Sequence, residues 1–181
     1  MKTLQEIYKN YQGKAGEGDK GTAHSYIDYY SKWFDCLKTK TFNLLEIGIA
    51  EGKSLKMWKE YFPNAHIFGV DIVNKIHYSE KNITVFHADA TSLNFLNLIE
   101  TLNFDIIIDD GSHILNDQIN ACSHLLPRLN SGGFYIIEDI RPDPSHSTKI
   151  NSQFNNIFEI YDLRHERPQS NDNIIMYYKK I

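Results

Sequence analysis

Short apolar segments alternate with longer amphipathic segments from residue 42 onward, and this alternation limits the folds open to the chain more than any other feature. Five of the apolar segments are nearly continuous hydrophobic runs, as expected of strands buried on both faces. These runs are residues 42–47, 66–71, 83–87, 104–109 and 133–138. Helical patterns lie between them at 53–61, 92–101 and 116–129. The sequence therefore predicts an α/β protein whose parallel sheet is covered by helices.

The pattern changes after the two prolines at positions 142 and 144. Two further β-rich segments, 157–164 and 174–180, are separated by the polar sequence RHERPQSNDN. Such a segment is typical of a turn between strands. We therefore expect an antiparallel pair to close a sheet of seven strands.

The region before residue 42 has a different character. It contains a short amphipathic segment at 4–11, a glycine-bearing loop at 13–24 and a helical pattern at 25–37. The chain has 181 residues, of which 41% are hydrophobic, and it contains no linker long enough to separate two cores. We predict one domain over 1–181, with an N-terminal helical arm and loop at 1–41 and a core at 42–181.

Composition excludes several classes of protein. The two cysteines, Cys36 and Cys122, provide neither a disulfide framework nor a multi-cysteine zinc site. No apolar run approaches the roughly 20 residues that span a bilayer, and the first ten residues lack the apolar core of a signal peptide. The net charge of -4 gives no footprint for nucleic acid. We expect a cytoplasmic protein that binds neither nucleic acid nor membrane.

A glycine-bearing turn, EIGIAEGKS, follows the first predicted strand. Asp71 ends the second strand, and Asp89 follows the third. Each acidic residue alone would be explained as a helix cap. Together they lie at the carboxyl ends of consecutive parallel strands, where ligands bind in such sheets, and a carboxylate there can accept both hydroxyls of a ribose. The turn has the spacing G-x-x-x-G rather than G-x-G-x-x-G, which argues against NAD.

The motifs LLEIGIAEGKS, GVDI and HADA resemble the first three motifs of the class I S-adenosylmethionine-dependent methyltransferases. The resemblance implies a Rossmann-like seven-stranded sheet of order 3-2-1-4-5-7-6, mostly parallel with its last strand antiparallel. It also implies that eight residues bind the cofactor: Glu46, Gly48, Gly52, Ser54, Asp71, Ile72, Asp89 and Ala90. In that scheme Asp71 holds the ribose hydroxyls, and Asp89 meets the adenine amino group. Ala50 departs from the family pattern, which often has a glycine at this position.

Acidic residues gather where the fourth and fifth predicted strands end. The fourth ends in Asp109-Asp110-Gly111-Ser112-His113, and the fifth ends in Glu138-Asp139. Carboxylates crowded in this way repel one another, and a bound Mg²⁺ or Mn²⁺ would relieve the repulsion. A neutral imidazole beside the metal could accept a proton at neutral pH. Because side chains alternate along a strand, we expect only one of Asp109 and Asp110 to ligate the metal.

The stretch from FDIIIDDGSH to FYIIEDI resembles the metal-dependent macrolide-sugar O-methyltransferases, the mycinamicin and macrocin methyltransferase group, and more distantly the cephalosporin-hydroxylase-like proteins. The resemblance covers residues 19–139. It implies that Asp110, Glu138 and Asp139 bind the metal and that His113 is the general base. Asp109 would then contact the cofactor or cap the next helix. In the upstream segment, Lys20, His24 and Tyr26 are candidates to close over the methionine carboxylate or the acceptor, and the alternative is a surface loop before a core helix, with Tyr26 packed in the core.

The predicted function is therefore divalent-metal-assisted transfer of a methyl group from S-adenosylmethionine to a hydroxyl of a sugar or sugar-containing small molecule. One alternative is transfer to a phosphate or phosphoramidate-type oxygen in capsule or surface polysaccharide synthesis. A second is a non-catalytic subunit that binds S-adenosylmethionine, and a third is a metal-dependent hydrolase or hydroxylase-like enzyme. A homo-oligomer is a further expectation, with the aromatic N-terminal helix as a contact surface.

Overall fold

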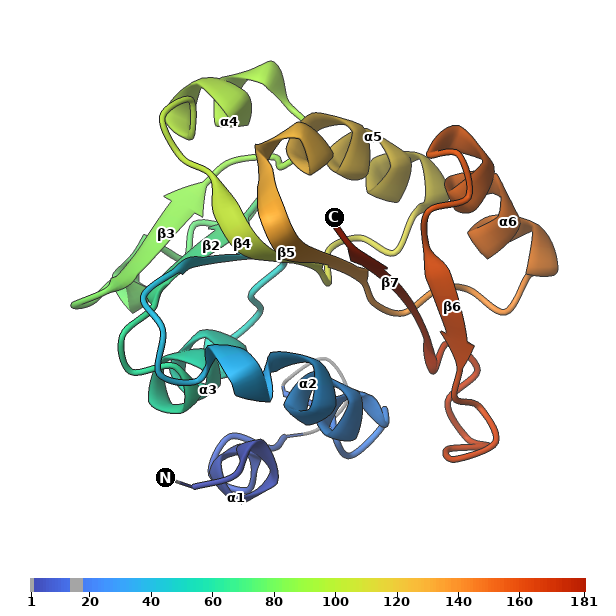
Figure 1. Ribbon diagram of the computed structural model, residues 1–181, viewed down its shortest axis with the longest axis horizontal. Helices are drawn as coiled ribbons and strands as arrows, with labels where there is room; N and C mark the ends of the chain where they lie inside the picture. The colour runs from blue at the N-terminus through green and yellow to red at the C-terminus, as the bar shows by residue number, and fades with distance from the viewer. Residues whose placement is uncertain (1, 14–17) are drawn as a thin grey trace.

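A seven-stranded sheet forms the centre of the computed structural model, which describes residues 2–13 and 18–181 (Figure 1). Part of the predicted loop at 13–24 lies outside the described residues. The strands are β1 (Asn43–Ile47), β2 (His66–Asp71), β3 (Ile83–His87), β4 (Phe104–Asp109), β5 (Leu129–Ile137), β6 (Glu159–Asp162) and β7 (Ile174–Lys179). Their order is β3-β2-β1-β4-β5-β7-β6. The first five strands run parallel, and β7 pairs antiparallel with both β5 and β6, as predicted.

Helices cover both faces of the sheet (Figure 1). One face carries α1 (Leu4–Tyr8), α2 (Tyr26–Phe34) and α3 (Lys53–Tyr61), and the other carries α4 (Leu93–Leu98), α5 (Leu115–Leu125) and α6 (Pro144–Gln153). Short 3₁₀ turns occupy Asp35–Leu37, Ile76–Tyr78 and Leu126–Arg128. Two of the predicted helices are shorter than expected, because the pattern at 92–101 gives a helix only over α4 and the pattern at 116–129 ends in a 3₁₀ turn.

Two hydrophobic cores lie on opposite sides of the sheet, because successive strand side chains point to opposite faces. Leu44 and Ile106 belong to the core under α1 to α3, and their neighbours Leu45 and Ile107 belong to the core under α4 to α6. All four side chains are fully buried. Burial on both faces explains why these strands appear in the sequence as continuous apolar runs.

The helix α6 and the start of β5 are not predicted by the sequence patterns. Helix α6 begins after Asp143, whose side chain accepts a hydrogen bond from the Ser145 backbone N–H, and Pro144 occupies its first turn. Its apolar face is weak, since only His146 and Ile150 are buried. Strand β5 starts at Leu129, four positions before the expected residue 133, and its register against β4 shifts near Ile106.

In the part of the chain that the structure describes, no helix is long and apolar enough to cross a membrane.

Candidate active site

Two adjoining cavities open at the carboxyl ends of the central strands. The larger has a volume of about 660 Å³, and the smaller has a volume of about 280 Å³. Gly48, Asp71 and Gly111 line both cavities. The larger cavity also contains predicted site residues of the N-terminal segment, the glycine turn and the acidic cluster: His24, Ser54, Asp110, His113 and Asp139. The smaller contains Ile72, Asp89, Ala90 and Asp109.

The glycine turn brings β1 close to β4. Gly48 has a φ of +75°, and a Cβ placed on it would lie 2.1 Å from the carbonyl oxygen of Asp110. Its backbone N–H donates to the carbonyl of Val70 on β2 at 2.9 Å. Only a residue without a side chain fits this position. Gly52, with a φ of +66°, precedes α3 as its N-cap.

Asp71 and Asp89 both accept hydrogen bonds from nearby backbone. The two oxygens of Asp71 accept from the N–H groups of Ile49 at 3.2 Å and Val73 at 2.8 Å, so this carboxylate connects the glycine turn to the loop after β2. Asp89 accepts from the backbone N–H of Thr91 at 2.8 Å. Neither residue is the N-cap of the helix that follows it, since Lys75 precedes the 3₁₀ turn after β2 and Ser92 caps α4, and both carboxylates line the smaller cavity.

Asp109 and Asp110 face opposite sides, as strand alternation predicts. Asp109 is 3% exposed, and burial raises its pKa to about 7. Its Oδ1 accepts from the backbone N–H of Gly111 at 3.2 Å, while its Oδ2 has no hydrogen-bond partner among the described residues. Asp110 points instead to the larger cavity.

Asp110, His113 and Asp139 form a group of possible metal ligands whose donor atoms all lie within 4.8 Å of one another. The His113 Nε2 atom is 3.9 Å from Oδ1 of Asp110, and its Nδ1 atom is 3.7 Å from Oδ2 of Asp139. Burial and the charge of Asp110 raise the pKa of Asp139 to about 6. His113 and Asp139 have φ values of +56° and +53°, in the left-handed region. Such strain tends to occur at functional sites.

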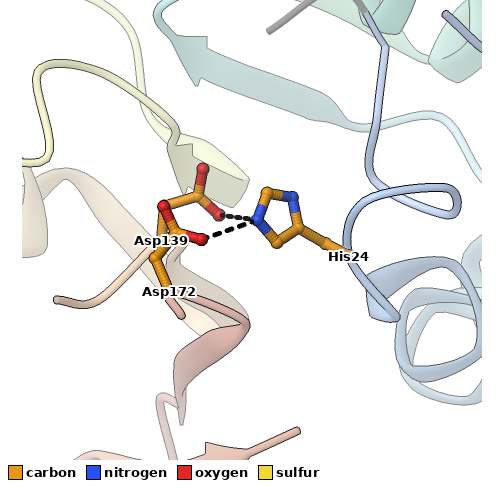
Figure 2. A group of neighbouring side chains, drawn as sticks. All are labelled: His24, Asp139 and Asp172. Carbon is orange, nitrogen blue, oxygen red and sulfur yellow. Dashed lines mark hydrogen bonds and ion pairs between the residues drawn. The ribbon is translucent and has the colours of Figure 1, made fainter. Parts of the chain in front are cut away.

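A second group of possible ligands shares Asp139 (Figure 2). Nε2 of His24 lies 3.5 Å from Oδ1 of Asp139 and 3.2 Å from Oδ1 of Asp172. The Tyr26 hydroxyl donates to the same Oδ1 of Asp139 at 2.8 Å. In the chain, His24 precedes α2, Asp139 follows β5, and Asp172 lies in the loop before β7. His24 and Tyr26 thus lie against the acidic cluster.

The ammonium of Lys20 lies among three carboxylates. Its Nζ atom is 2.7 Å from Oδ2 of Asp110, 2.7 and 2.8 Å from the two oxygens of Glu138, and 3.3 Å from Oε1 of Glu46. Burial opposes the charged amine, but the three carboxylates raise the pKa of Lys20 well above its usual value. Burial raises the pKa of Glu46. The Tyr30 hydroxyl donates to Oε1 of Glu138.

The predicted residues therefore divide into two sets. Most line the cavities, but Glu46, Gly52, Tyr26 and Glu138 do not. Glu138 is 1% exposed and is not part of either group of possible metal ligands. Tyr30 and Asp172 also contact the site and were not predicted. Tyr30 looks like a core aromatic in the sequence, and Asp172 lies in a polar loop without a motif.

Comparisons with known proteins identify relatives by sequence and by fold. No family model matches the sequence. The 8-demethyl-8-alpha-L-rhamnosyl tetracenomycin-C 2'-O-methyltransferase of Streptomyces olivaceus is 36% identical over 132 residues, which cover 68% of this chain and 35% of that protein. Mycinamicin VI 2''-O-methyltransferase of Micromonospora griseorubida is 36% identical over 129 residues, which cover 66% of this chain and 32% of that protein. The chain matches about a third of the length of these curated relatives.

Solved structures give the same result. The MycE methyltransferase from the mycinamycin biosynthetic pathway, in complex with Mg and SAH, has a TM-score of 0.80 and 25% identity, covering 99% of this chain and 55% of that one. Another structure of MycE also holds mycinamycin VI and has a TM-score of 0.78. By fold and by sequence, the chain belongs to the class I methyltransferases and is related to the O-methyltransferases of the mycinamicin and tetracenomycin type.

Proposed function

We propose that the chain transfers a methyl group from S-adenosylmethionine to a hydroxyl oxygen, with the help of a divalent metal. The observation that carries the proposal is the junction of the two cavities at Gly48 and Asp71. One cavity has the acidic strand ends suited to the ribose and adenine of the cofactor, and the other has the possible metal ligands. A methyl donor in the first would therefore lie beside an acceptor held in the second.

The residues fit a hard divalent cation. Asp110 and Asp139 each have one oxygen bonded within the protein, to Lys20 and Tyr26 respectively, and each turns its other oxygen toward His113. Oxygen ligands of this kind suit Mg²⁺ or Mn²⁺. When bound, such an ion would polarise the acceptor oxygen and fix its orientation. We propose Asp110 and Asp139 as its ligands.

The chain's own residues would perform the remaining steps. Asp71 orients the ribose, while Asp89 and Ala90 border the adenine region of the smaller cavity. We propose that His113, which lines the larger cavity, accepts the proton of the acceptor hydroxyl. Methyl transfer is then an in-line displacement whose rate depends on positioning and on removal of that proton.

The relatives suggest the acceptor. Their names specify O-methylation of a rhamnosyl tetracenomycin and of mycinamicin VI, and MycE has been solved with mycinamycin VI bound. We therefore propose a sugar-containing small molecule as the acceptor of this chain.

Calorimetry with S-adenosylmethionine tests the cofactor half of the proposal. We expect Asp71→Asn to bind the cofactor at least about tenfold more weakly than wild type, since a neutral amide accepts the ribose hydroxyls less well. Asp105→Asn is the matched control, because Asp105 lies at the opposite end of β4, where it binds the Asn43 backbone and Asn130. Failure of the wild-type chain to bind S-adenosylmethionine would favour a hydrolase or hydroxylase-like enzyme.

Formation of S-adenosylhomocysteine with a panel of acceptors tests the catalytic half. The panel contains glycosylated small molecules and sugar phosphates, with and without excess EDTA. We expect turnover with a sugar hydroxyl and its loss in EDTA. Turnover that persists in EDTA contradicts the metal role, transfer only to phosphate oxygens supports the surface-polysaccharide alternative, and cofactor binding without any turnover supports a non-catalytic subunit.

A further inference from the structure

We propose that Gln118 is a positioning residue of the site, because its side-chain amide holds the peptide group that joins Glu138 to Asp139. The direction of the Asp139 carboxylate depends on that peptide group. Gln118 lies on α5 and lines neither cavity, so it acts through Asp139 and not on a bound molecule. This inference rests on the proposed function, in which Asp139 binds the divalent metal.

The peptide group between Glu138 and Asp139 lies just beyond the sheet. Ile137 is the last residue of β5 that pairs with either neighbouring strand. Asp139 then has a φ of +53°, in the left-handed region. A residue other than glycine keeps such a conformation only where its surroundings fix it. The contacts of this peptide group therefore decide how Asp139 is oriented.

Side chains from opposite faces of the sheet hold the two ends of the peptide group. The Gln118 Nε2 atom donates to the carbonyl oxygen of Glu138 at 3.2 Å. The N–H of Asp139 donates to the Tyr26 hydroxyl oxygen at 3.3 Å. Gln118 belongs to α5 and Tyr26 to α2, which cover different faces (Figure 1). The peptide plane is thus fixed from both layers of helices.

A third residue fixes the orientation of the Gln118 amide. The Nε2 atom of His146, on α6, lies 2.7 Å from Oε1 of Gln118. A carbonyl oxygen can only accept, so the NH₂ group of Gln118 faces Glu138 and its oxygen accepts from His146. Gln118 is 1% exposed and His146 is 4% exposed. Water therefore does not compete for these hydrogen bonds.

Packing alone does not require an amide at this position. Four residues of α5 are buried, and the other three are Ala121, Cys122 and Leu125. Gln118 is the polar member of this set and lies nearest the site. An apolar side chain of the same length would fill the space but would leave the Glu138 carbonyl without its donor. Loss of the amide should therefore free the peptide plane and leave the core filled.

Binding of Mn²⁺, measured by calorimetry and by electron paramagnetic resonance, tests the positioning role. Gln118→Met keeps the length of the side chain and removes both hydrogen bonds. We expect it to bind Mn²⁺ at least about tenfold more weakly than wild type, as is usual when a partner of a metal ligand is lost. Asp139→Asn, which alters the ligand itself, should weaken binding at least as much.

Leu125→Val is the matched control. Leu125 is fully buried on the same helix, so its truncation loosens packing without removing a hydrogen bond. We expect this variant to bind Mn²⁺ within about threefold of wild type, because its site is distant and independent. Circular dichroism and urea denaturation show that each variant is folded and how far it is destabilised. Equal Mn²⁺ affinity in Gln118→Met and Leu125→Val would show that Gln118 only stabilises the fold, and the proposal would be wrong.

A second substitution covers the case in which Gln118→Met does not fold. Gln118→Asn keeps a polar amide, but its shorter side chain does not reach both His146 and Glu138. We expect the same loss of Mn²⁺ affinity, and wild-type affinity in a folded Gln118→Asn variant would overturn the proposal.

Amide NMR spectra of the metal-free chain test the peptide plane directly. If the plane turns, the N–H of Asp139 changes its direction and its hydrogen-bond partner. We therefore expect the Asp139 amide signal to shift, and its exchange with solvent to become faster, in Gln118→Met but not in Leu125→Val. An unchanged Asp139 signal in Gln118→Met would overturn the proposal.

Failure of the proposed function is seen separately. It appears as a wild-type chain that binds no S-adenosylmethionine or no Mn²⁺. The spectra of the metal-free variants depend on neither ligand. A shifted Asp139 signal in Gln118→Met would then still show that Gln118 holds the peptide group, and an unshifted signal would overturn that role as well.

Discussion

The Tyr26 hydroxyl donates a 2.8 Å hydrogen bond to Oδ1 of Asp139 and so connects the start of α2 to the end of β5. The hydroxyl oxygen also accepts from the Asp139 backbone N–H at 3.3 Å, and the carbonyl oxygen of Asp172 lies 3.1 Å from it. Asp139 is therefore held in one orientation, with its Oδ2 turned toward His113.

Tyr26→Phe removes this bond while keeping the buried ring. Partners of metal ligands usually contribute about 10- to 100-fold to metal affinity, and we expect Mn²⁺ binding to weaken by about tenfold. The lost hydrogen bond should also lower the free energy of unfolding by about 1–2 kcal/mol. Tyr29→Phe is the control, because the one hydrogen-bond partner of the Tyr29 hydroxyl among the described residues is the exposed Glu166, at 3.3 Å. Equal Mn²⁺ affinity in both variants would show that Tyr26 does not position Asp139.

His113→Ala tests the proton acceptor. Loss of a general base typically costs about 10²- to 10⁴-fold in rate, and we expect a fall of that size in kcat with cofactor affinity within about threefold of wild type. His165→Ala is the control, since the His165 side chain is 73% exposed and distant from the acidic cluster in sequence. The readout is single-turnover formation of S-adenosylhomocysteine. If His113→Ala loses Mn²⁺ binding to the same degree as Asp139→Asn, His113 is a metal ligand rather than the base.

The sheet was predictable from the sequence because its strands are buried on both faces. Each of β1 to β4 coincides with its predicted run to within one residue. Helix α6 was missed because its pattern is mostly polar. The Asp143–Pro144 pair that begins it is a local signal that does not depend on hydrophobic periodicity.

The site was predictable where its residues follow strand ends and unpredictable where they come from loops. Asp110 and Asp139 meet because β4 and β5 are neighbours. The pairing of Lys20 with Glu138 joins residues 118 positions apart, and no spacing rule relates a loop lysine to a strand end. The sequence could indicate Lys20 as a site residue but not which carboxylate its ammonium would bind.

Ala50→Gly tests the strain at the glycine turn. Ala50 has a φ of +41° and is exposed. A left-handed conformation costs a non-glycine residue about 1–2 kcal/mol. Replacement of alanine by glycine costs about 0.4–1 kcal/mol, because it increases the conformational entropy of the unfolded chain. We therefore expect a net gain of about 0.5 kcal/mol, measured as a higher urea midpoint with an unchanged slope. Ala88→Gly, outside the left-handed region, should lower the midpoint. A similar decrease in both variants would contradict strain at Ala50.

Acidification should destabilise the protein partly through His146. This side chain is 4% exposed, its Nε2 lies 2.7 Å from Oε1 of Gln118, and burial lowers its pKa. A histidine with a lowered pKa in the folded state contributes stability that is fully present above its unfolded pKa of about 6.5 and is lost as the pH falls below that value.

We therefore expect wild type to lose more free energy of unfolding between pH 7 and pH 5 than His146→Gln, which has no such titration. Urea denaturation at both pH values measures the difference. His77→Gln, at an exposed histidine, should follow wild type, because it retains His146 and every other titrating group except His77 itself. Parallel losses in wild type and His146→Gln would show that protonation of His146 does not contribute to acid destabilisation.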